Sequence, residues 1–247
     1  MEQQFIKSAP SFAATVLDVF ASPSEAFESI KDSVPSPSLW LIPMLCAFII
    51  FASHTFILFA DNTLKAEFLN TQSTVLYNKV KEGKLTKDET DQVESNMNSM
   101  SDTMIVFTIA GGVIIVPLSY FGCALLLWLA NKIIFKSSIV YIKILELFGI
   151  TTWINLLGRV FSIALMLAFG TAAATPSAAL AVLESYNSAN IFHRDLTSLN
   201  IFSIWEVFVI GIGLGKLSGK SSSAGIIVAL GLWALLVGSS ILLGFTR

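Results

Sequence analysis

Three side chains with acid–base or ion-pairing chemistry fall inside long apolar runs of this sequence: His54, Arg159 and Glu206. A charge at the centre of a bilayer costs about 2.5–3.5 kcal/mol on insertion scales, so such groups usually pair or line a wet cavity. At ~1.5 Å per helical residue, Arg159 lies roughly 15 Å and Glu206 roughly 8 Å from the same end of their antiparallel spans. Long side chains can bridge much of that difference. We therefore predict a structural Arg159–Glu206 pair.

The alternative is that these groups line a polar path. His54 could then relay protons, because imidazole titrates near neutral pH. A lone intramembrane histidine is more often a hydrogen-bonded packing residue. The alternative function is a small channel or transporter that uses Arg159, Glu206 and His54.

Motifs for catalysis or cofactor binding are absent from the sequence. It has no H-E-x-x-H, no G-x-S-x-G and no His/Cys/carboxylate cluster at ligand spacing. The stretch GLGKLSGKSS (213–222) fails as a phosphate loop, because neither Gly213 nor Gly215 leaves four residues before the next Gly-Lys-Ser. Cys46 and Cys123 both lie in apolar runs and are interpreted as small buried hydrophobes. We predict no catalytic, cofactor or metal site.

The composition predicts an all-α polytopic membrane bundle. Hydrophobic residues make up 54% of the chain and charged residues 13%, against roughly 25% charged in soluble domains. The net charge of −2 gives no footprint for nucleic acid. A span needs about 20 apolar residues, which defines a membrane domain over 39–247. The five predicted spans are 39–60, 104–130, 150–169, 201–216 and 224–245, with a polar loop at 61–103.

The region before the third span allows two interpretations. Because Ile139–Phe148 carries Lys143 and Glu146, we expect it to lie along the interface, with Glu146 near Lys143. In the second interpretation, 137–170 forms a re-entrant hairpin and the protein has four spans.

Lysine distribution predicts the orientation. Short segments on the N-terminal side carry seven lysines, whereas most of those in the 61–103 loop lie too far from a span end to count. The positive-inside rule then places the N-terminus in the cytoplasm, and the 61–103 loop and the C-terminus outside, in the cell inner membrane. The seven are Lys7, Lys31, Lys132, Lys136, Lys143, Lys216 and Lys220.

Residues 1–38 form a predicted cytoplasmic amphipathic region. Apolar residues from Phe12 to Phe20 recur at helical spacing. A second helix begins at Ser22, with Pro23 at its first position and Glu25 completing a capping box. Its apolar side chains rest on lipid or on the bundle. The candidate interfacial residues are Phe20, Phe27, Ile30 and Trp40.

Gly211 and Gly215 form a G-x-x-x-G pattern in the fourth predicted span. Small residues at this spacing let two helices approach closely. Packing within the chain is the favoured interpretation, and packing between protomers is the alternative.

Several of these features together resemble the Ypt-interacting protein (Yip) family in its bacterial form. The motifs are F-x-S-P-x-x-A-F at 20–27, the tryptophan-containing start of the first span at Leu39, Trp40 and Pro43, the Val140–Gly149 region, Phe202–Trp205 and the glycines of 211–215.

The resemblance implies a helical membrane domain of about five spans with a cytoplasmic N-terminus. Eukaryotic members are associated with vesicle traffic and Rab-type GTPases. We expect a non-enzymatic scaffold in membrane trafficking or homeostasis, without cofactors. Its expected partners are the lipid bilayer, a cytosolic protein and a second copy of the chain. The long 61–103 loop and Glu206 beside Trp205 depart from the family pattern.

Overall fold

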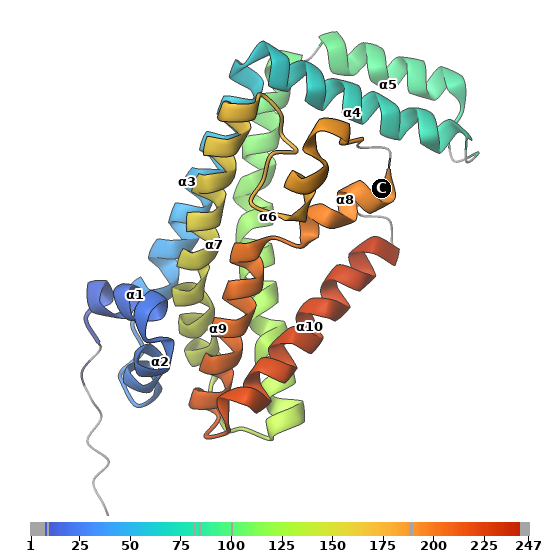
Figure 1. The fold of residues 1–247 in the computed structure, drawn as a ribbon. Coiled ribbons are helices and arrows are strands. Elements are labelled where there is room, and N and C mark those ends of the chain that lie inside the picture. The colour runs from blue at the N-terminus through green and yellow to red at the C-terminus, as the bar shows by residue number, and fades with distance from the viewer. Residues whose placement is uncertain are drawn as a thin grey trace, which may run out of the picture. The chain divides into compact units, whose positions relative to one another are not determined.

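The computed structural model describes residues 8, 10–81, 83, 85–99, 101–187 and 190–242, and in this part of the chain the regular structure is helical (Figure 1). Four helices are long and apolar enough to cross a membrane. They are α3 (Ser38–Ala60), α6 (Ser101–Ala130), α7 (Tyr141–Phe169) and α10 (Ser222–Leu242). The fold class is therefore the predicted all-α polytopic bundle.

The chain divides into two compact units, and α3, α6 and α7 contribute residues to both. Unit 1 comprises Met1–Phe48, Ile115–Gly158 and Phe202–Gly238. Unit 2 comprises Ile49–Ile114, Arg159–Ile201 and Ser239–Arg247.

Unit 1 contains α1 (Phe12–Ala21), α2 (Pro23–Lys31), the π-helical turn η1 (Asn131–Phe135) and most of α9 (Ile201–Leu217) and α10. Its core joins the N-terminal helices to the spans. Fully buried members of this core come from α1, α2, α3, α7 and α9: Val19, Phe27, Ile30, Leu39, Ile144, Leu147, Ile150, Ile154 and Leu214.

Helix α2 begins where the sequence predicts, but its capping box does not form. Ser22 is the N-cap residue and Pro23 the first helical residue, as expected. The Ser22 side chain makes no capping hydrogen bond, and only its backbone carbonyl accepts, from the amides of Glu25 and Ala26. The capping-box pattern therefore predicts where α2 begins, but it does not predict the hydrogen bonds of the side chains at that position.

Helix α7 differs from both sequence interpretations. One uninterrupted helix covers Tyr141–Phe169, in place of an interfacial segment followed by a span at 150–169 or a hairpin over 137–170. The charges of Lys143 and Glu146 suggested a break, but they pair with each other inside protein.

The predicted span at 201–216 corresponds to α9. Its 17 residues measure ~26 Å, slightly less than a hydrocarbon core of about 30 Å. Its second half is buried inside unit 1. Whether α9 crosses the membrane stays a prediction.

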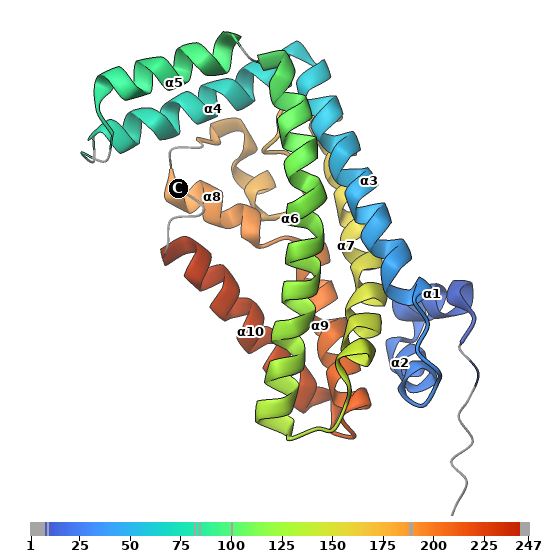
Figure 2. The same cartoon turned by 180° about the vertical axis from the view of Figure 1, so that it is seen from behind.

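Unit 2 contains α4 (Asn62–Lys81), α5 (Lys87–Ser99), the 3₁₀ segment η2 (Ala178–Ser185) and α8 (Ile191–Ser198). Helices α4 and α5 run side by side as a hairpin (Figure 2). This hairpin and its turn near Gly83 were predicted, and Gly83 adopts φ 70°, a conformation that glycine tolerates best. Glu82 and Lys84 lie outside the described residues.

Candidate functional site

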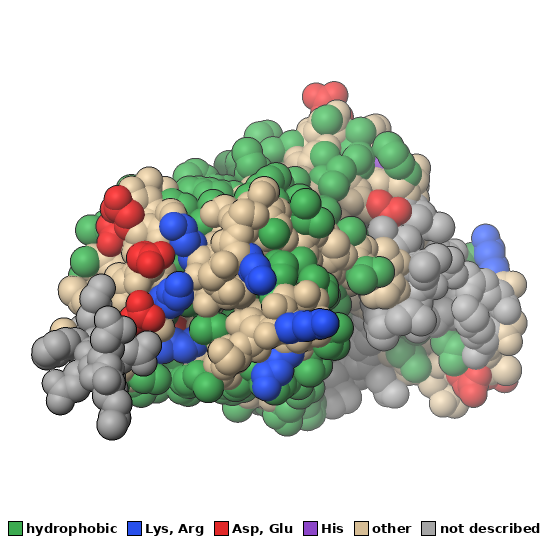
Figure 3. Space-filling view, turned by 90° about the horizontal axis from the view of Figure 1, so that it is seen from below, with side chains coloured by type: hydrophobic (Ala, Val, Ile, Leu, Met, Phe, Trp, Pro, Cys, Tyr) green, Lys and Arg blue, Asp and Glu red, His purple; other side chains and the backbone are tan. Residues whose placement is uncertain are grey.

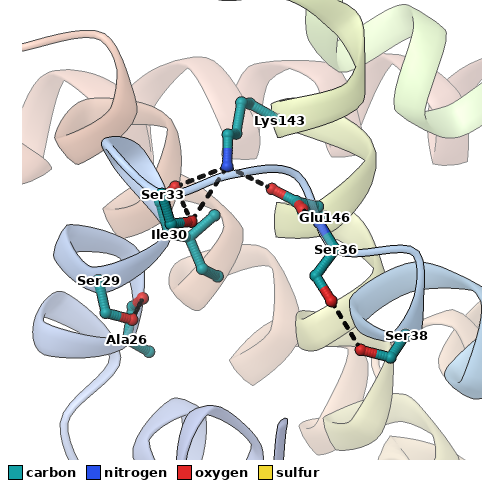
Figure 4. A network of polar contacts seen from close by, with 8 residues as sticks. All are labelled: Ala26, Ser29, Ile30, Ser33, Ser36, Ser38, Lys143 and Glu146. Carbon is teal, nitrogen blue, oxygen red and sulfur yellow. Dashed lines mark hydrogen bonds and ion pairs between the residues drawn. The ribbon is translucent and has the colours of Figure 1, made fainter. Parts of the chain in front are cut away.

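A buried ion pair on α7 holds the N-terminal region of unit 1 (Figure 4). Lys143 Nζ lies 2.9 Å from Glu146 Oε2, three residues further along the helix, and the two side chains are 7% and 0% exposed. Residues three apart on a helix are neighbours on its surface. A charge buried to this degree is tolerated only when it is paired and hydrogen-bonded.

Each member of the pair also binds the chain that leaves α2. Lys143 Nζ donates to the Ile30 carbonyl at 2.8 Å and contacts Ser33 Oγ at 3.2 Å. Glu146 accepts a hydrogen bond from the backbone amide of Ser36. Helix ends leave carbonyls without intrahelical partners; the Ile30 carbonyl accepts from the Ser33 hydroxyl at 2.9 Å, and the lysine adds a charged donor to the same oxygen. The pair therefore fixes the exit of α2 onto α7, and we name Ile30, Ser33, Ser36, Lys143 and Glu146 the α2 latch.

The apolar face of α2 is buried against other helices of unit 1. Ala26, Phe27 and Ile30 are fully buried, and Phe27 lies against Gly213 of α9. A Cβ at Gly213 would meet Leu147 at 2.7 Å and Phe27 at 3.0 Å. Of the two environments expected for Phe27 and Ile30, lipid or bundle, the structure shows the bundle.

Two other candidate interfacial residues make aromatic contacts in unit 1. Phe20 packs edge-on against Trp205 at 5.7 Å, and Trp40 against Phe121 at 5.8 Å. Tyr120 Oη donates to the Trp40 carbonyl at 2.9 Å. These contacts place both rings against protein on at least one face, and contact with the membrane interface stays a prediction.

Gly211 and Gly215 lie where α9 meets α10. A Cβ at Gly211 would collide with the Ile226 backbone, and one at Gly215 would meet Ser221 O at 2.5 Å. Gly225 of α10 completes the crossing, because its own Cβ position is occupied by the Gly211 carbonyl. These glycines serve packing within one chain.

The predicted intramembrane polar residues are distributed over both units. Arg159 and His54 belong to unit 2 and Glu206 to unit 1, so the Arg159–Glu206 pair stays a prediction. Within unit 1, Asn155 Nδ2 donates to Glu206 Oε2 at 3.1 Å. Both residues line a pocket of about 270 Å³ whose other walls are mostly apolar.

Lysines gather on one face of unit 1 (Figure 3). They are carried by η1 and the residue that follows it, by the last turn of α9 and by the turn that joins α9 to α10. Ser218 of that turn donates to Asn131 Oδ1 at 3.0 Å, which ties the two elements together. We name this the basic face: Lys132, Lys136, Lys216 and Lys220.

The α2 latch was not predicted from the sequence. Glu146 was expected at the interface near Lys143; its proximity to Lys143 is confirmed, and its position at the interface stays a prediction. The spacing of three residues between opposite charges, inside an apolar helix, was the available signal. Within the described residues no group of three His, Cys, Asp or Glu is placed to hold a metal, and Cys46 and Cys123 are free thiols.

A family model described as Yip1 domain matches residues 17–243, nearly the whole chain. No curated protein and no solved structure matches.

Proposed function

This chain belongs to the Yip1 domain family, and from that premise we propose that it acts as a non-enzymatic scaffold in the cell inner membrane, presenting its N-terminal helices to a cytosolic protein. The family match and the four long apolar helices make it an integral, multi-pass membrane protein.

The α2 latch carries this proposal. An amphipathic helix that anchors to lipid needs its apolar face free to enter the interface. In α2 that face is buried against Leu147 and Gly213, while the latch fixes the end of the helix. What α2 offers to its surroundings is its polar side, where Glu25 and Glu28 are exposed and Glu28 lies 3.8 Å from Lys216. Asp32, which caps the end of the helix, is also exposed. This supports docking of a protein partner over insertion into lipid.

The exposed acidic groups Glu25, Glu28 and Asp32, together with the exposed apolar side chains of the N-terminal region, indicate the chemistry of the partner. Leu17 of α1 is 69% exposed and Val34 is 47% exposed. A partner surface with basic residues around a small apolar centre would complement these groups. The basic face supports the cytoplasmic orientation, since lysines close to anionic lipid contribute about 1 kcal/mol each.

Site-specific photocrosslinking in intact cells tests the proposal. A benzophenone amino acid at Leu17 or Glu25 should give a recurrent protein adduct. The same group at Leu118, which is 70% exposed on α6, serves as the control. If the probes at Leu17 and Glu25 give only the adducts that the probe at Leu118 also gives, docking at the N-terminal helices is refuted.

The expectation of self-association loses part of its basis. Gly211 and Gly215 are occupied by α10 of the same chain. A second copy would have to use another surface.

The transporter alternative rests on the Glu206 pocket. Its mostly apolar walls do not resemble a path for hydrated ions. Ion or solute flux in proteoliposomes that Glu206→Gln abolishes, with folding intact, would favour transport over the scaffold.

A further inference from the structure

Unit 2 holds an open groove of about 910 Å³ that the proposed function does not use. One wall is α4, and the opposite wall is built from residues 172–187 and α8. Its volume is in the upper part of the range of small-molecule sites, about 300–1,000 Å³. Under the predicted orientation this groove faces the extracytoplasmic side.

Hydroxyl and amide groups recur along the α4 wall. Thr63, Asn70, Thr71 and Thr74 all line the groove. Spacings of three, four, seven and eight residues place side chains on the same helical face. These residues form a polar stripe that also contains Glu67 and is interrupted by Ala66 and Phe68, and none of the described lining residues of α4 is positively charged.

Two threonines of this stripe, Thr71 and Thr74, are oriented as hydrogen-bond acceptors. Thr71 Oγ1 donates to the Glu67 carbonyl at 2.9 Å, and Thr74 Oγ1 donates to the Asn70 carbonyl at 2.9 Å. A hydroxyl has one proton and two lone pairs. With the proton directed to the helix backbone, its lone pairs are left for a ligand that supplies donors.

The opposite wall adds hydroxyl, amide and aromatic groups. Thr175 and Asn187 line it. Tyr186 stacks on His193 with ring centroids 5.9 Å apart. On the α4 side, Phe68 is held edge-on against Phe59 at 5.4 Å. Tyr186 and Phe68 thus bring fixed aromatic surfaces to the groove.

Glu67, the one charged residue among the described lining residues, has a structural role. Glu67 accepts from Thr171 Oγ1 at 2.6 Å and from the Ala172 amide at 3.0 Å, one bond to each carboxylate oxygen. It thereby fixes the 171–173 segment against α4. Among the lining residues that the structure describes there is no lysine or arginine, the side chains that recognise phosphate or carboxylate.

We propose that this groove binds a neutral saccharide. Acceptor-oriented hydroxyls, side-chain amides and aromatic surfaces match a ligand with many hydroxyl donors and apolar ring faces. Among the described lining residues an anionic ligand would find no lysine or arginine, and a hydrocarbon would leave the polar stripe unpaired. The saccharide can come from a glycolipid headgroup or from a free glycan, since both present the same chemistry.

Binding is tested with the full chain in nanodiscs of phosphatidylethanolamine and phosphatidylglycerol, free of sugar-based detergent. The soluble probes are maltotriose and N,N′-diacetylchitobiose, followed by saturation-transfer NMR and calorimetry. The lipid probe is monoglucosyl diacylglycerol incorporated in the nanodisc, followed by changes in the tyrosine and threonine resonances. Inorganic phosphate is the anionic comparison.

Two double variants of α4 distinguish the groove from the rest of the helix. Asn70→Ala/Thr74→Val removes polar groups from the stripe, and we expect binding about tenfold weaker. Gln72→Ala/Ser73→Ala changes polar residues of the same helix outside the lining, and should bind like the unmodified chain. Circular dichroism and the thermal midpoint establish that both variants fold.

Saturable binding of a soluble probe, weakened only by the groove variant, supports a free glycan as ligand. Binding of the glycolipid alone, with the same variant pattern, supports a lipid headgroup. The proposal is overturned if no saccharide binds saturably, if both double variants bind equally, or if phosphate competes as well as the sugars. None of these results depends on a partner at the N-terminal helices.

Discussion

Glu146 and Lys143, three residues apart on α7, form a 2.9 Å ion pair inside unit 1. Together they bind Ile30 in the last turn of α2 and Ser33 and Ser36 in the chain that joins α2 to α3. An ion pair alone would be weak evidence for stability, because desolvation offsets much of the attraction. Here each charge also satisfies a backbone group of the N-terminal segment. The pair therefore links the position of α2 to the first turn of α7.

Breaking this pair on one side should be costly. Glu146→Gln leaves the Lys143 ammonium buried without a counter-charge, a defect that typically costs about 3–5 kcal/mol. We expect a comparable loss in the free energy of unfolding, measured by denaturation in mixed micelles, and faster tryptic cleavage at Lys31.

The double variant Lys143→Met/Glu146→Leu separates charge from packing. Because neither charge remains, the double variant should lose less free energy of unfolding than the single variants Lys143→Met and Glu146→Leu lose together. Lys220→Met, at an exposed position, is the control. Additive losses would show that the two groups act independently.

Only part of the α2 latch can be predicted from the sequence. The spacing of Lys143 and Glu146 is visible in the sequence, but Ser36 lies 110 residues from Glu146. No local pattern indicates which backbone amide a buried carboxylate will find. Hydrophobicity located α3, α6 and α10 to within a few residues, because a span is a local property, whereas α7 begins nine residues before the span predicted at 150–169.

Gly225 lies where α9 and α10 approach most closely, and substituting it should separate them. A methyl group there would meet backbone atoms of Gly211 and Gly215, which cannot move as a flexible side chain can. We expect Gly225→Ala to lower the free energy of unfolding by about 1–3 kcal/mol.

Gly231 is the matched control, since it lies on the same helix with nothing within 4 Å of its Cβ position. Gly231→Ala should be neutral or stabilising, because alanine is the better helix former. Equal effects of the two substitutions would mean that the close crossing is not maintained in the membrane.

The sequence predicts only one side of the close contact between α9 and α10. Gly211 and Gly215 signalled a close approach by their spacing. Gly225 stands outside that pattern, and its role depends on the turn that brings α10 back along α9. The partner helix of a small-residue motif is a tertiary property.

Phe27 anchors α2 in the core of unit 1. It is fully buried, and Phe→Ala substitutions in cores cost about 3–5 kcal/mol. Phe27→Ala should lower the unfolding free energy by this amount and expose α2 to protease. Leu17→Ala, at a position 69% exposed on the adjacent α1, should change stability by less than about 0.5 kcal/mol. If the two variants were equally stable, docking of α2 in the membrane-embedded protein would be disproved.

The path of α9 determines on which side the chain ends. If α9 crosses, there are five spans and the termini lie on opposite sides. If it does not, four spans place them on the same side. Alkaline phosphatase and green fluorescent protein, each fused after Arg247, report extracytoplasmic and cytoplasmic ends respectively. We expect phosphatase activity and no fluorescence, with the reverse pattern at the N-terminus.

Thr86 and Glu89 form the reciprocal capping box that Ser22 and Glu25 do not. Glu89 Oε2 accepts from the Thr86 amide and hydroxyl, both at 2.8 Å, and the Glu89 amide donates to Thr86 Oγ1 at 3.3 Å. Both stretches match the same S/T-x-x-E pattern. Ser22, whose backbone has φ −145° and ψ 65°, lies outside the extended conformation typical of a capping residue. The motif predicts a helix start, and the backbone of the preceding chain determines the side-chain bonds.

This box makes the start of α5 sensitive to acid. The Thr86 amide, and then its hydroxyl, lower the pKa of Glu89 below its ordinary value of 4.5. A lowered pKa in the folded state adds stability above the unfolded pKa, and this stability is lost as the pH falls through the folded pKa. Hydrogen exchange at the first turn of α5 should therefore show more frequent opening, after correction for intrinsic rates, at pH 3 than at pH 6. Glu89→Gln should remove most of this dependence, whereas Asp91→Asn, an exposed change on the same helix, should retain it. An opening equilibrium in Glu89→Gln with the same pH dependence as the unmodified chain would contradict the assignment to this carboxylate.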